Sequence, residues 1–480
     1  MVQGQDMAGA LVGESTRAEA ELETLIDRLK SRLRLAVVYG GNKQTPGGVV
    51  YPARNTRAWK SYEAVAVDIA AALQRLGFRH IELMPDDMRL ADRLVRGGIH
   101  MAWLNTGGVQ GSNPMAHAPS LLEMLGVPYL GHDPLAVTTL DNKHAFKREA
   151  VCAGLPTAPF TTWHMRRGRF DPDVNTRFQR AFGDYEGPFV VKPVSGRASL
   201  HVHVVLDRHG LPDVVEAVHE ASQNVVLIEK FLEGSEYCIA VAGPVHAVNG
   251  VLRRNPGPLV FSALERILSA DERIFTSMDV RPITDERCRN LDPQADAAAL
   301  AELRRIGREV FLEFNLSSVV RLDLRADQNG AIHILEANPK PDLKAPGDGV
   351  MSLISAGLPA MGMSYDDLIL SLFADRLDDL VRRRRDTIGH IIELLEPAAA
   401  RGAFSESYQE VAQASAVAEA SRATVDALAT NALAEQSSSP AAIGDIAADA
   451  SVRALTAVAR SGRPGRRPEA AAPPERRAKR

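Results

Sequence analysis

The sequence predicts a mixed fold, α/β in its first part and α+β in its second, arranged in about three lobes. In the first part, short apolar runs alternate with helical patterns, which is typical of a layered α/β domain. In the second part, apolar runs follow one another across short turns, which is typical of antiparallel hairpins. With 45% hydrophobic and 24% charged residues over 480 positions, the chain can fill the cores of roughly two to four domains.

The predicted elements begin with a leader helix over Glu14–Leu33, where apolar residues recur at helical spacing. A β-branched run at Leu33–Tyr39 predicts a strand, and Tyr62–Leu76 predicts the helix that follows it. The loop between them, Asn42–Lys60, is long and rich in cationic residues. It is therefore either a substrate lid or a surface insertion.

Strands and helices continue to alternate along the next hundred or so residues. Strands are predicted at His80–Met84, Met101–Leu104 and Val127–Gly131, and helices at Ala118–Leu125 and Thr139–Ala153. The glycine-rich segment Asn105–Gly111 follows a strand and can approach a phosphate group closely. Its glycines lack the spacing of a dinucleotide fingerprint, so we do not expect a dinucleotide site there.

A strand with a lysine near its end opens the next part of the chain. Phe189–Pro193 is otherwise apolar, small residues follow at Ser195–Ser199, and a second strand is predicted at Leu200–Leu206. A lysine beside a flexible loop of small residues can contact phosphates through its charge and through backbone N–H groups. An exposed lysine on a surface hairpin fits the same pattern, so both interpretations stay open.

The most informative stretch is a predicted β-hairpin around the turn Asp327–Gly330. Strand alternation puts Arg321 with Asp323 on one face of their strand, and Glu336 with Asn338 on one face of theirs. Two carboxylates and an amide oxygen form a hard oxygen cluster that suits Mg²⁺, although a solvated hairpin face fits the same residues. The elements predicted before this hairpin are strands at Val225–Ile228 and Glu236–Val241 and a helix at Ala297–Phe314.

The C-terminal part changes character. Tyr365–Leu395 predicts a helix, with Arg382–Arg385 as a solvated face. From about residue 400 the chain is poor in large apolar residues and rich in Ala, Ser and finally Pro and Arg. Such a segment cannot bury enough surface to offset chain entropy, so we expect a disordered or intermittently helical tail.

Charge, cysteines and the N-terminus argue against several classes of protein. The net charge of −4 does not suggest a nucleic-acid binder, and no apolar run approaches the roughly 20 residues of a membrane span. Cys152, Cys238 and Cys288 lie far apart and outside metal-site spacing, which predicts neither disulfides nor zinc, and the first two read as small core residues. Because the N-terminus lacks a secretion signal, a reducing cytoplasm is expected.

The order of these segments, from about Leu33 to Leu372, resembles the ATP-grasp superfamily and within it the D-alanine–D-alanine ligase group. The matching segments are Asp141-Asn142-Lys143 with Lys147, Gly154-Leu155-Pro156-Thr157, Phe189–Pro193, Ser195–Ser199, Glu229–Leu232 and the hairpin from Arg321 to Asn338. The resemblance implies a three-lobed ATP-grasp fold. Its implied parts are a leader helix (1–32), an N-terminal α/β pre-ATP-grasp domain (33–135), a small ATP-grasp lobe (136–236), a large C-terminal ATP-grasp lobe (237–375), a C-terminal helix (376–398) and a tail (399–480).

The resemblance also implies roles for individual residues. Those expected to bind nucleotide are Lys143, Lys192, Ser199, Glu229, Lys230, Leu232 and Glu236, with Glu229 at the adenine amino group and Glu236 at the ribose. Asp323, Glu336 and Asn338 are expected to ligate two Mg²⁺ ions, for which Mn²⁺ can substitute. Arg321 is the expected catalytic residue, because the oxyanion of a tetrahedral intermediate needs a positive donor.

The implied activity is ATP-dependent formation of an amide or peptide bond through an acyl phosphate, with ADP and phosphate as co-products. A carboxylate and a γ-phosphate are both anions, so cations must bring them together before phosphoryl transfer. An amine then attacks the acyl phosphate, and loop closure keeps water away from it. The expected partners are ATP and small amino-acid or peptide-like molecules, neither nucleic acid nor a membrane, with a homodimer as one option for assembly.

Departures from the family pattern concern the acceptor half of the site. Asn105 stands where the family has a histidine, and Asp342 stands where a glycine N–H would help to hold the oxyanion. We therefore expect substrates other than two D-alanines, with Lys340, Asp342 and Lys344 near the acceptor. The family's lysine and tyrosine on the preceding loop have no clear counterpart, and the nearest substitutes are Arg273, Phe275 and Arg281.

Two other functions fit the same sequence. One is a nucleotide-binding regulatory or scaffold protein without ligase activity, docked through its tail. The other is an enzyme that makes an acyl phosphate and passes it to an acceptor other than an amine.

Overall fold

A computed structural model describes residues 17–42, 44–49, 60–111, 113–196, 200–269, 272–274, 286–347, 352–383, 388–389, 391 and 394, all within one compact unit. The predicted leader helix is present over residues 17–30 of this range. The predicted tail beyond residue 400 lies outside the described residues, as do residues 43 and 50–59 of the predicted loop Asn42–Lys60. No helix in the described ranges is long and apolar enough to cross a membrane.

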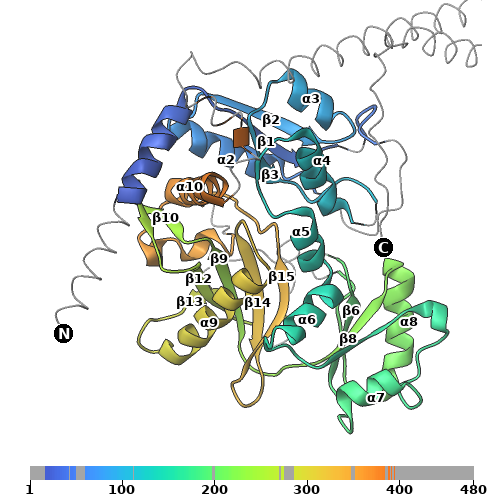
Figure 1. The fold of residues 1–480 in the computed structure, drawn as a ribbon. Coiled ribbons are helices and arrows are strands. Elements are labelled where there is room, and N and C mark those ends of the chain that lie inside the picture. Colours follow the sequence, from blue (N-terminus) through green and yellow to red (C-terminus); the bar gives the residue numbers. More distant parts are fainter. Residues whose placement is uncertain are drawn as a thin grey trace, which may run out of the picture. The chain divides into compact units, whose positions relative to one another are not determined.

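The N-terminal part folds around a parallel sheet of order β2-β1-β3-β4 (Figure 1). Its strands are β1 (Arg34–Gly40), β2 (His80–Asp86), β3 (Met101–Asn105) and β4 (Tyr129–Leu130), and its helices are α2 (Glu63–Arg75), α3 (Leu90–Arg96) and α4 (His117–Leu125). The predicted strand–loop–helix pattern is confirmed. Alternate residues of β1 face opposite layers, since Leu35 and Val37 pack with α2 whereas Ala36 and Val38 pack with α3 and α4.

The single helix predicted at Thr139–Ala153 is wrong. The structure has two helices, α5 (Pro134–Asp141) and α6 (Lys143–Cys152), separated at Asn142. Asn142 has an extended backbone, and its side-chain oxygen accepts hydrogen bonds from the first N–H groups of α6. Asparagine is a favoured N-cap because it satisfies donors that the helix itself cannot, so the chain restarts a helix here instead of continuing one.

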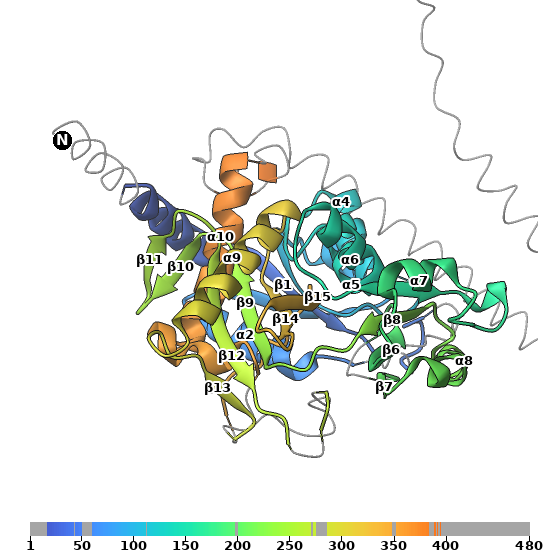
Figure 2. The same cartoon turned by 90° about the horizontal axis from the view of Figure 1, so that it is seen from below.

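A second sheet, antiparallel and of order β5-β8-β6-β7, follows (Figure 2). Its strands are β5 (Phe160–Trp163), β6 (Phe189–Pro193), β7 (His203–Val205) and β8 (Val226–Lys230), and α7 (Thr176–Phe182) and α8 (Leu211–Ser222) lie beside it. β7 is shorter than the predicted Leu200–Leu206. Phenylalanines 170, 178 and 189 fill the core between this sheet and its helices.

The third sheet is the central one for the site and has the order β13-β12-β9-β14-β15. Its strands are β9 (Glu236–Ala242), β12 (Leu259–Arg266), β13 (Cys288–Asn290), β14 (Val320–Ala326) and β15 (Ile332–Asn338), and α9 (Ala297–Glu313) covers one face (Figure 1). The predicted β14–β15 hairpin is confirmed, with Arg321 opposite Asn338 and Asp323 opposite Glu336. Opposite residues project to the same face, so these four side chains share one surface of the sheet.

The remaining elements complete the described chain. They are β10 (Val245–Val248), β11 (Val251–Arg254), α10 (Tyr365–Arg383) and the 3-10 turns Pro114–Ala116, Met165–Arg167, Arg208–Gly210, Ser355–Gly357 and Pro359–Met361. The β10–β11 hairpin packs against α10. In the predicted basic face, Arg382 is exposed and pairs with Asp378, whereas Arg384 and Arg385 lie outside the described residues. The three cysteines, all described, form no disulfide, and the prediction of a core position for Cys152 is wrong, because this residue is exposed at the end of α6.

Candidate functional site

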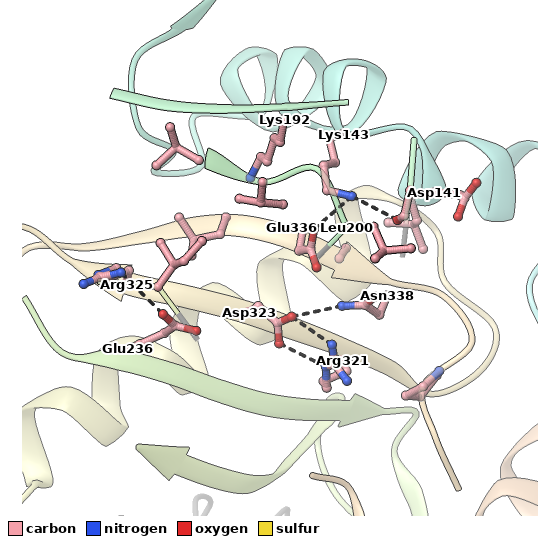
Figure 3. Close-up of a pocket in the computed structure, with 18 of the residues that line it drawn as sticks. Asp141, Lys143, Lys192, Leu200, Glu236, Arg321, Asp323, Arg325, Glu336 and Asn338 are labelled. Atoms are coloured by element: carbon pink, nitrogen blue, oxygen red, sulfur yellow. Dashed lines mark hydrogen bonds and ion pairs between the residues drawn. The ribbon is translucent and has the colours of Figure 1, made fainter. Parts of the chain in front are cut away.

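A cavity of about 260 Å³ is bounded by the second sheet on one side and by the β14–β15 hairpin on the other. Lys143 and Lys192 approach it from one side, and Asp323, Asn338 and Arg321 face them from the other (Figure 3). The predicted site residues that line it are Lys143, Lys192, Glu229, Lys230, Leu232, Glu236, Arg321, Asp323, Glu336, Asn338, Lys340 and Asp342. Segments up to two hundred residues apart therefore meet at one place.

Three lysines, Lys143, Lys147 and Lys192, form what we call the lysine cluster. Lys192 Nζ lies 2.8 Å from Oε2 of Glu229, and Lys147 Nζ lies 2.9 Å from Oε1 of the same carboxylate. Lys143 Nζ lies 3.0 Å from Oε2 of Glu336. Lys143 and Lys192 line the cavity, whereas Lys147 is fully buried behind it and also donates to the carbonyl oxygen of Ile334.

The lysine cluster holds its carboxylates in the charged form. Burial alone would raise the pKa of Glu229, but Lys147 and Lys192 outweigh it and lower that pKa. Burial would lower the pKa of Lys192, but Glu229 and Glu336 raise it. For Lys147 burial is the larger effect and its pKa is lowered, even though Glu229 opposes the shift. Two cations thus contact one buried anion, so these three side chains together carry a net positive charge.

The predicted adenine segment Glu229–Leu232 runs along the cavity from the end of β8. The N–H of Phe231 donates to the carbonyl oxygen of Pro188, which fixes this segment against the start of β6. The ammonium group of Lys230 lies 4.8 Å from the ring centroid of Tyr185. Glu229 was expected to accept from an adenine amino group, but its two oxygens contact lysines here.

Three arginines, Arg266, Arg321 and Arg325, form the arginine cluster. Arg321 binds Asp323 through both ends of its guanidinium, with Nε 3.0 Å from Oδ1 and Nη2 2.9 Å from Oδ2. Arg266 joins two acids, because its Nη2 lies 2.9 Å from Oδ1 of Asp323 and its Nη1 lies 2.8 Å from Oε1 of Glu236. Arg325 Nη1 lies 3.5 Å from Oε2 of Glu236. Glu236, expected at the ribose, is thus held between two guanidinium groups.

The sheet register explains this arrangement. Glu236 of β9 stands opposite Arg266 of β12 on one side and opposite Arg325 of β14 on the other. Three residues in one row across antiparallel strands project to the same face, so the acid meets both cations. Burial would lower the pKa of Arg266 and of Arg321, but Asp323 outweighs it and raises both.

Lys340 and Asp342, which were predicted to lie near an acceptor, line the cavity together with Lys60 and Tyr62. The ammonium group of Lys340 lies 3.1 Å from the ring centroid of Tyr62, a cation–π contact. Lys344, by contrast, does not line this cavity. Its N–H donates to Oδ1 of Asp342, and its carbonyl oxygen accepts from Ser355.

Some predicted residues contribute nothing that can be described. Ser199, expected in the phosphate loop, lies outside the described residues, as do Phe275 and Arg281. Arg273 is exposed and does not line the cavity, although its carbonyl oxygen accepts a hydrogen bond from Arg325. The neighbouring Ile274 lines the cavity instead.

Sequence reasoning missed Arg266, Arg325, Lys60 and Tyr62 as cavity residues. A signal for Arg266 was present, because Leu259–Arg266 is apolar at most positions and a charged residue at the end of such a strand needs a partner. The partner could not be read from the sequence, since Asp323 lies 57 residues further along the chain.

The predicted Mg²⁺ ligands differ in how accessible they are. The Glu336 side chain is 27% exposed and pairs with one lysine, and Asn338 donates its amide to Oδ2 of Asp323 at 3.2 Å, which leaves its own oxygen for another partner. One carboxylate and one amide oxygen beside the lysine cluster fit a Mg²⁺ ion that keeps several waters. Asp323 does not fit a second ion in this arrangement, because both of its oxygens already accept from arginines.

The chain is similar to known proteins over much of its length. The family model described as D-ala D-ala ligase C-terminus matches residues 151–374. The D-alanine–D-alanine ligase of Sodalis glossinidius is 30% identical over 285 residues, which cover 59% of this chain and 67% of that protein. The D-alanine–D-alanine ligase of Gloeobacter violaceus is 25% identical over 310 residues, or 65% of this chain and 92% of that protein.

Solved structures share the fold at low sequence identity. The D-alanine–D-alanine ligase of Bacillus anthracis, in complex with ATP, has a TM-score of 0.50 and 18% identity, and the match covers 72% of this chain and 97% of that one. The VanG D-Ala:D-Ser ligase of Enterococcus faecalis has a TM-score of 0.52 and 16% identity, covering 72% and 99%. The chain therefore has an ATP-grasp fold and is a ligase that belongs to the D-alanine–D-alanine ligase family.

Proposed function

We propose that this ligase uses ATP to join a carboxylate to an amine through an acyl phosphate, and that its substrates are not two D-alanines. The observation that supports this most is the convergence of Lys143 and Lys192 with Arg321 around one cavity. A triphosphate and a substrate carboxylate are both anionic, so a group of cations around one cavity suits a site where the two approach each other.

Each cation has a task suited to its chemistry. Lys143 and Lys192 have single charges on flexible stems, which can leave Glu336 and Glu229 to contact phosphate oxygens. Arg321 is held by Asp323 through two hydrogen bonds, so its guanidinium is oriented before the substrate binds. A fixed donor of this kind stabilises the oxyanion that forms when the amine attacks.

A bound Mg²⁺ ion would neutralise phosphate charge during phosphoryl transfer. Glu336 and Asn338 are the residues we propose to hold it, since both line the cavity from one face of β15 and Glu336 contacts Lys143. Lys143 would then move from Glu336 to a phosphate oxygen. Glu229–Leu232 would receive the adenine, and Glu236 the ribose once nucleotide competes with its arginines.

The residues after Asn338 suit an amino-acid acceptor, and we base the proposal of a substrate other than D-alanine on their departure from the family pattern, in which a glycine stands where this chain has Asp342. Asp342 and Lys340 place opposite charges on the cavity wall next to Tyr62. A zwitterionic amino acid or a short peptide has a matching ammonium and carboxylate. We propose that these residues orient the acceptor, and that Asp342→Gly changes the order of preference among amino acids.

The test combines the purified chain with ATP, Mg²⁺ and pools of L- and D-amino acids, followed by assays for ADP and phosphate and by mass spectrometry of the products. Amide products other than D-alanyl-D-alanine support the proposal, with Lys192→Met as the inactive control. Hydroxamate formed with hydroxylamine, without an amide, would point to a different acceptor. Phosphate release at the level of Lys192→Met would favour a regulatory nucleotide-binding protein instead.

A further inference from the structure

We propose that Arg266 is a built-in cation that takes the place of one divalent ion, so that the site binds one Mg²⁺ with ATP instead of two. This inference rests on the proposed ATP-dependent function. The guanidinium of Arg266 lies between Asp323 and Glu236, 2.9 Å and 2.8 Å from the nearest oxygen of each. Its side chain is only 7% exposed, so it is a buried, fixed part of the site.

The hydrogen bonds of Asp323 leave no room for a metal. A carboxylate offers about four lone-pair positions. Oδ1 accepts from Nη2 of Arg266 and from Nε of Arg321, and Oδ2 accepts from Nη2 of Arg321 and from Nδ2 of Asn338. A divalent ion at Asp323 would have to displace one of these donors and sit beside two guanidinium charges.

Glu336 offers the opposite environment. Its described ion pair is with Lys143, at 3.0 Å, and more than a quarter of its side chain is exposed to the cavity. A lysine ammonium is a single point charge on a flexible stem, and phosphate oxygens can draw it away from Glu336. The two acids stand opposite each other on β14 and β15, yet only Glu336 is open to a metal ion.

Arg266 also suits a permanent role. Its position in one cross-strand row with Glu236 and Arg325 holds it in place through the sheet itself. Arginine remains protonated at every pH at which the protein is folded, so its charge is constant. Unlike a metal ion, it cannot be removed by chelators or by dilution.

The experiment counts bound metal directly. The full chain is mixed with Mn²⁺ and a non-hydrolysable ATP analogue, free Mn²⁺ is measured by electron paramagnetic resonance, and the bound spectrum is examined for coupling between neighbouring ions. One Mn²⁺ per bound nucleotide, without coupling, is expected for the wild type. Arg266→Met should raise the count above one and produce a coupled signal. The matched control is Arg325→Met, which removes an arginine from Glu236 but none from Asp323 and should leave the count at one.

Two coupled Mn²⁺ ions in the wild type would overturn the inference while leaving the proposed function intact. The inference also fails if Arg266→Met binds nucleotide and still holds one ion. Absence of nucleotide binding to the wild type would overturn both the proposed function and this inference.

Discussion

The lysine cluster and the arginine cluster face each other across one cavity and neutralise acids in different ways. The lysines come from α6 and β6 and meet their carboxylates one contact at a time. The arginines come from β12 and β14 of a single sheet. Arg266 bridges two acids, and Arg321 binds one acid through two hydrogen bonds. Lysine contacts can be exchanged for a ligand at little geometric cost, whereas forked arginine contacts orient the groups they bind. We infer that one side of the site receives phosphates and the other is a preformed framework.

Within the lysine cluster, Lys147 and Lys192 provide the sharpest contrast, because both contact Glu229 but only Lys192 lines the cavity. Replacing either with methionine leaves Glu229 with one lysine instead of two, which should lower the free energy of unfolding by about 1.5 to 3 kcal/mol, the contribution of one charged hydrogen bond. Only Lys192→Met should also abolish ATP binding. Denaturant unfolding and calorimetric titration with ATP test the pair. If Lys147→Met loses ATP affinity to the same extent, the division of roles within this cluster is wrong.

Arg321 and Arg325 provide the corresponding contrast in the arginine cluster. Removing an oxyanion donor lowers kcat by about 10²- to 10³-fold. Arg321→Met should show a loss of this size with little change in nucleotide affinity, because its partner is Asp323 and it lies at the end of β14 nearer the acceptor. Arg325→Met removes a contact to Glu236 and hydrogen bonds to the carbonyl oxygens of Gly234 and Arg273, but none to Asp323, and should reduce kcat much less. Steady-state kinetics of the two variants test this prediction. Equal losses in kcat would mean that the cluster acts as one electrostatic unit.

Acceptor choice is expected to depend on the segment after Asn338, which belongs to neither cluster. Asp342→Gly removes a charge from the cavity wall and should lower kcat/KM for the preferred amino acid by about tenfold, corresponding to one charged hydrogen bond. The KM for ATP should hardly change. Identical kinetics over a panel of amino acids would remove Asp342 from the acceptor site.

Asp375 on α10 is a buried carboxylate that belongs to neither cluster, and its pKa is shifted in the opposite direction to that of Glu229. Its Oδ1 accepts a hydrogen bond from the N–H of Val245 at 3.1 Å, and burial, reinforced by Asp378 and Asp379, raises its pKa to about 7. A raised pKa means that the folded state binds the proton more tightly than the unfolded state does. Its contribution to stability is therefore complete below pH about 4 and is lost as the pH rises to about 7.

Asp375→Asn removes this ionisation and keeps an oxygen that can accept from Val245. The variant should be more stable than the wild type at pH 8, by on the order of 4 kcal/mol, and similar to it at pH 4. Thermal unfolding at both pH values provides the measurement. A wild-type advantage at pH 8 would contradict the prediction.

Much of the fold could be predicted because its signals are local. The β14–β15 hairpin follows from strand alternation around Asp327–Gly330, and the structure has the predicted strands. The break between α5 and α6 also has a local signal, the capping side chain of Asn142, but helical periodicity across it predicts one continuous helix. Lys344 was placed in the site by its distance from Asn338 along the chain, whereas the chain turns away after Asp342.

The sequence by itself determined which residues could take part: two lysines near the ends of elements, an arginine two residues from an aspartate on one strand of a hairpin, and an acid with an amide on the other. Only the tertiary structure decided which cation neutralises which acid. Arg266 meets Glu236 and Asp323 because β12 and β14 both pair with β9, over sequence separations of 30 and 57 residues. Local periodicity decides which face of a strand a side chain occupies, but the register of distant strands decides its neighbours.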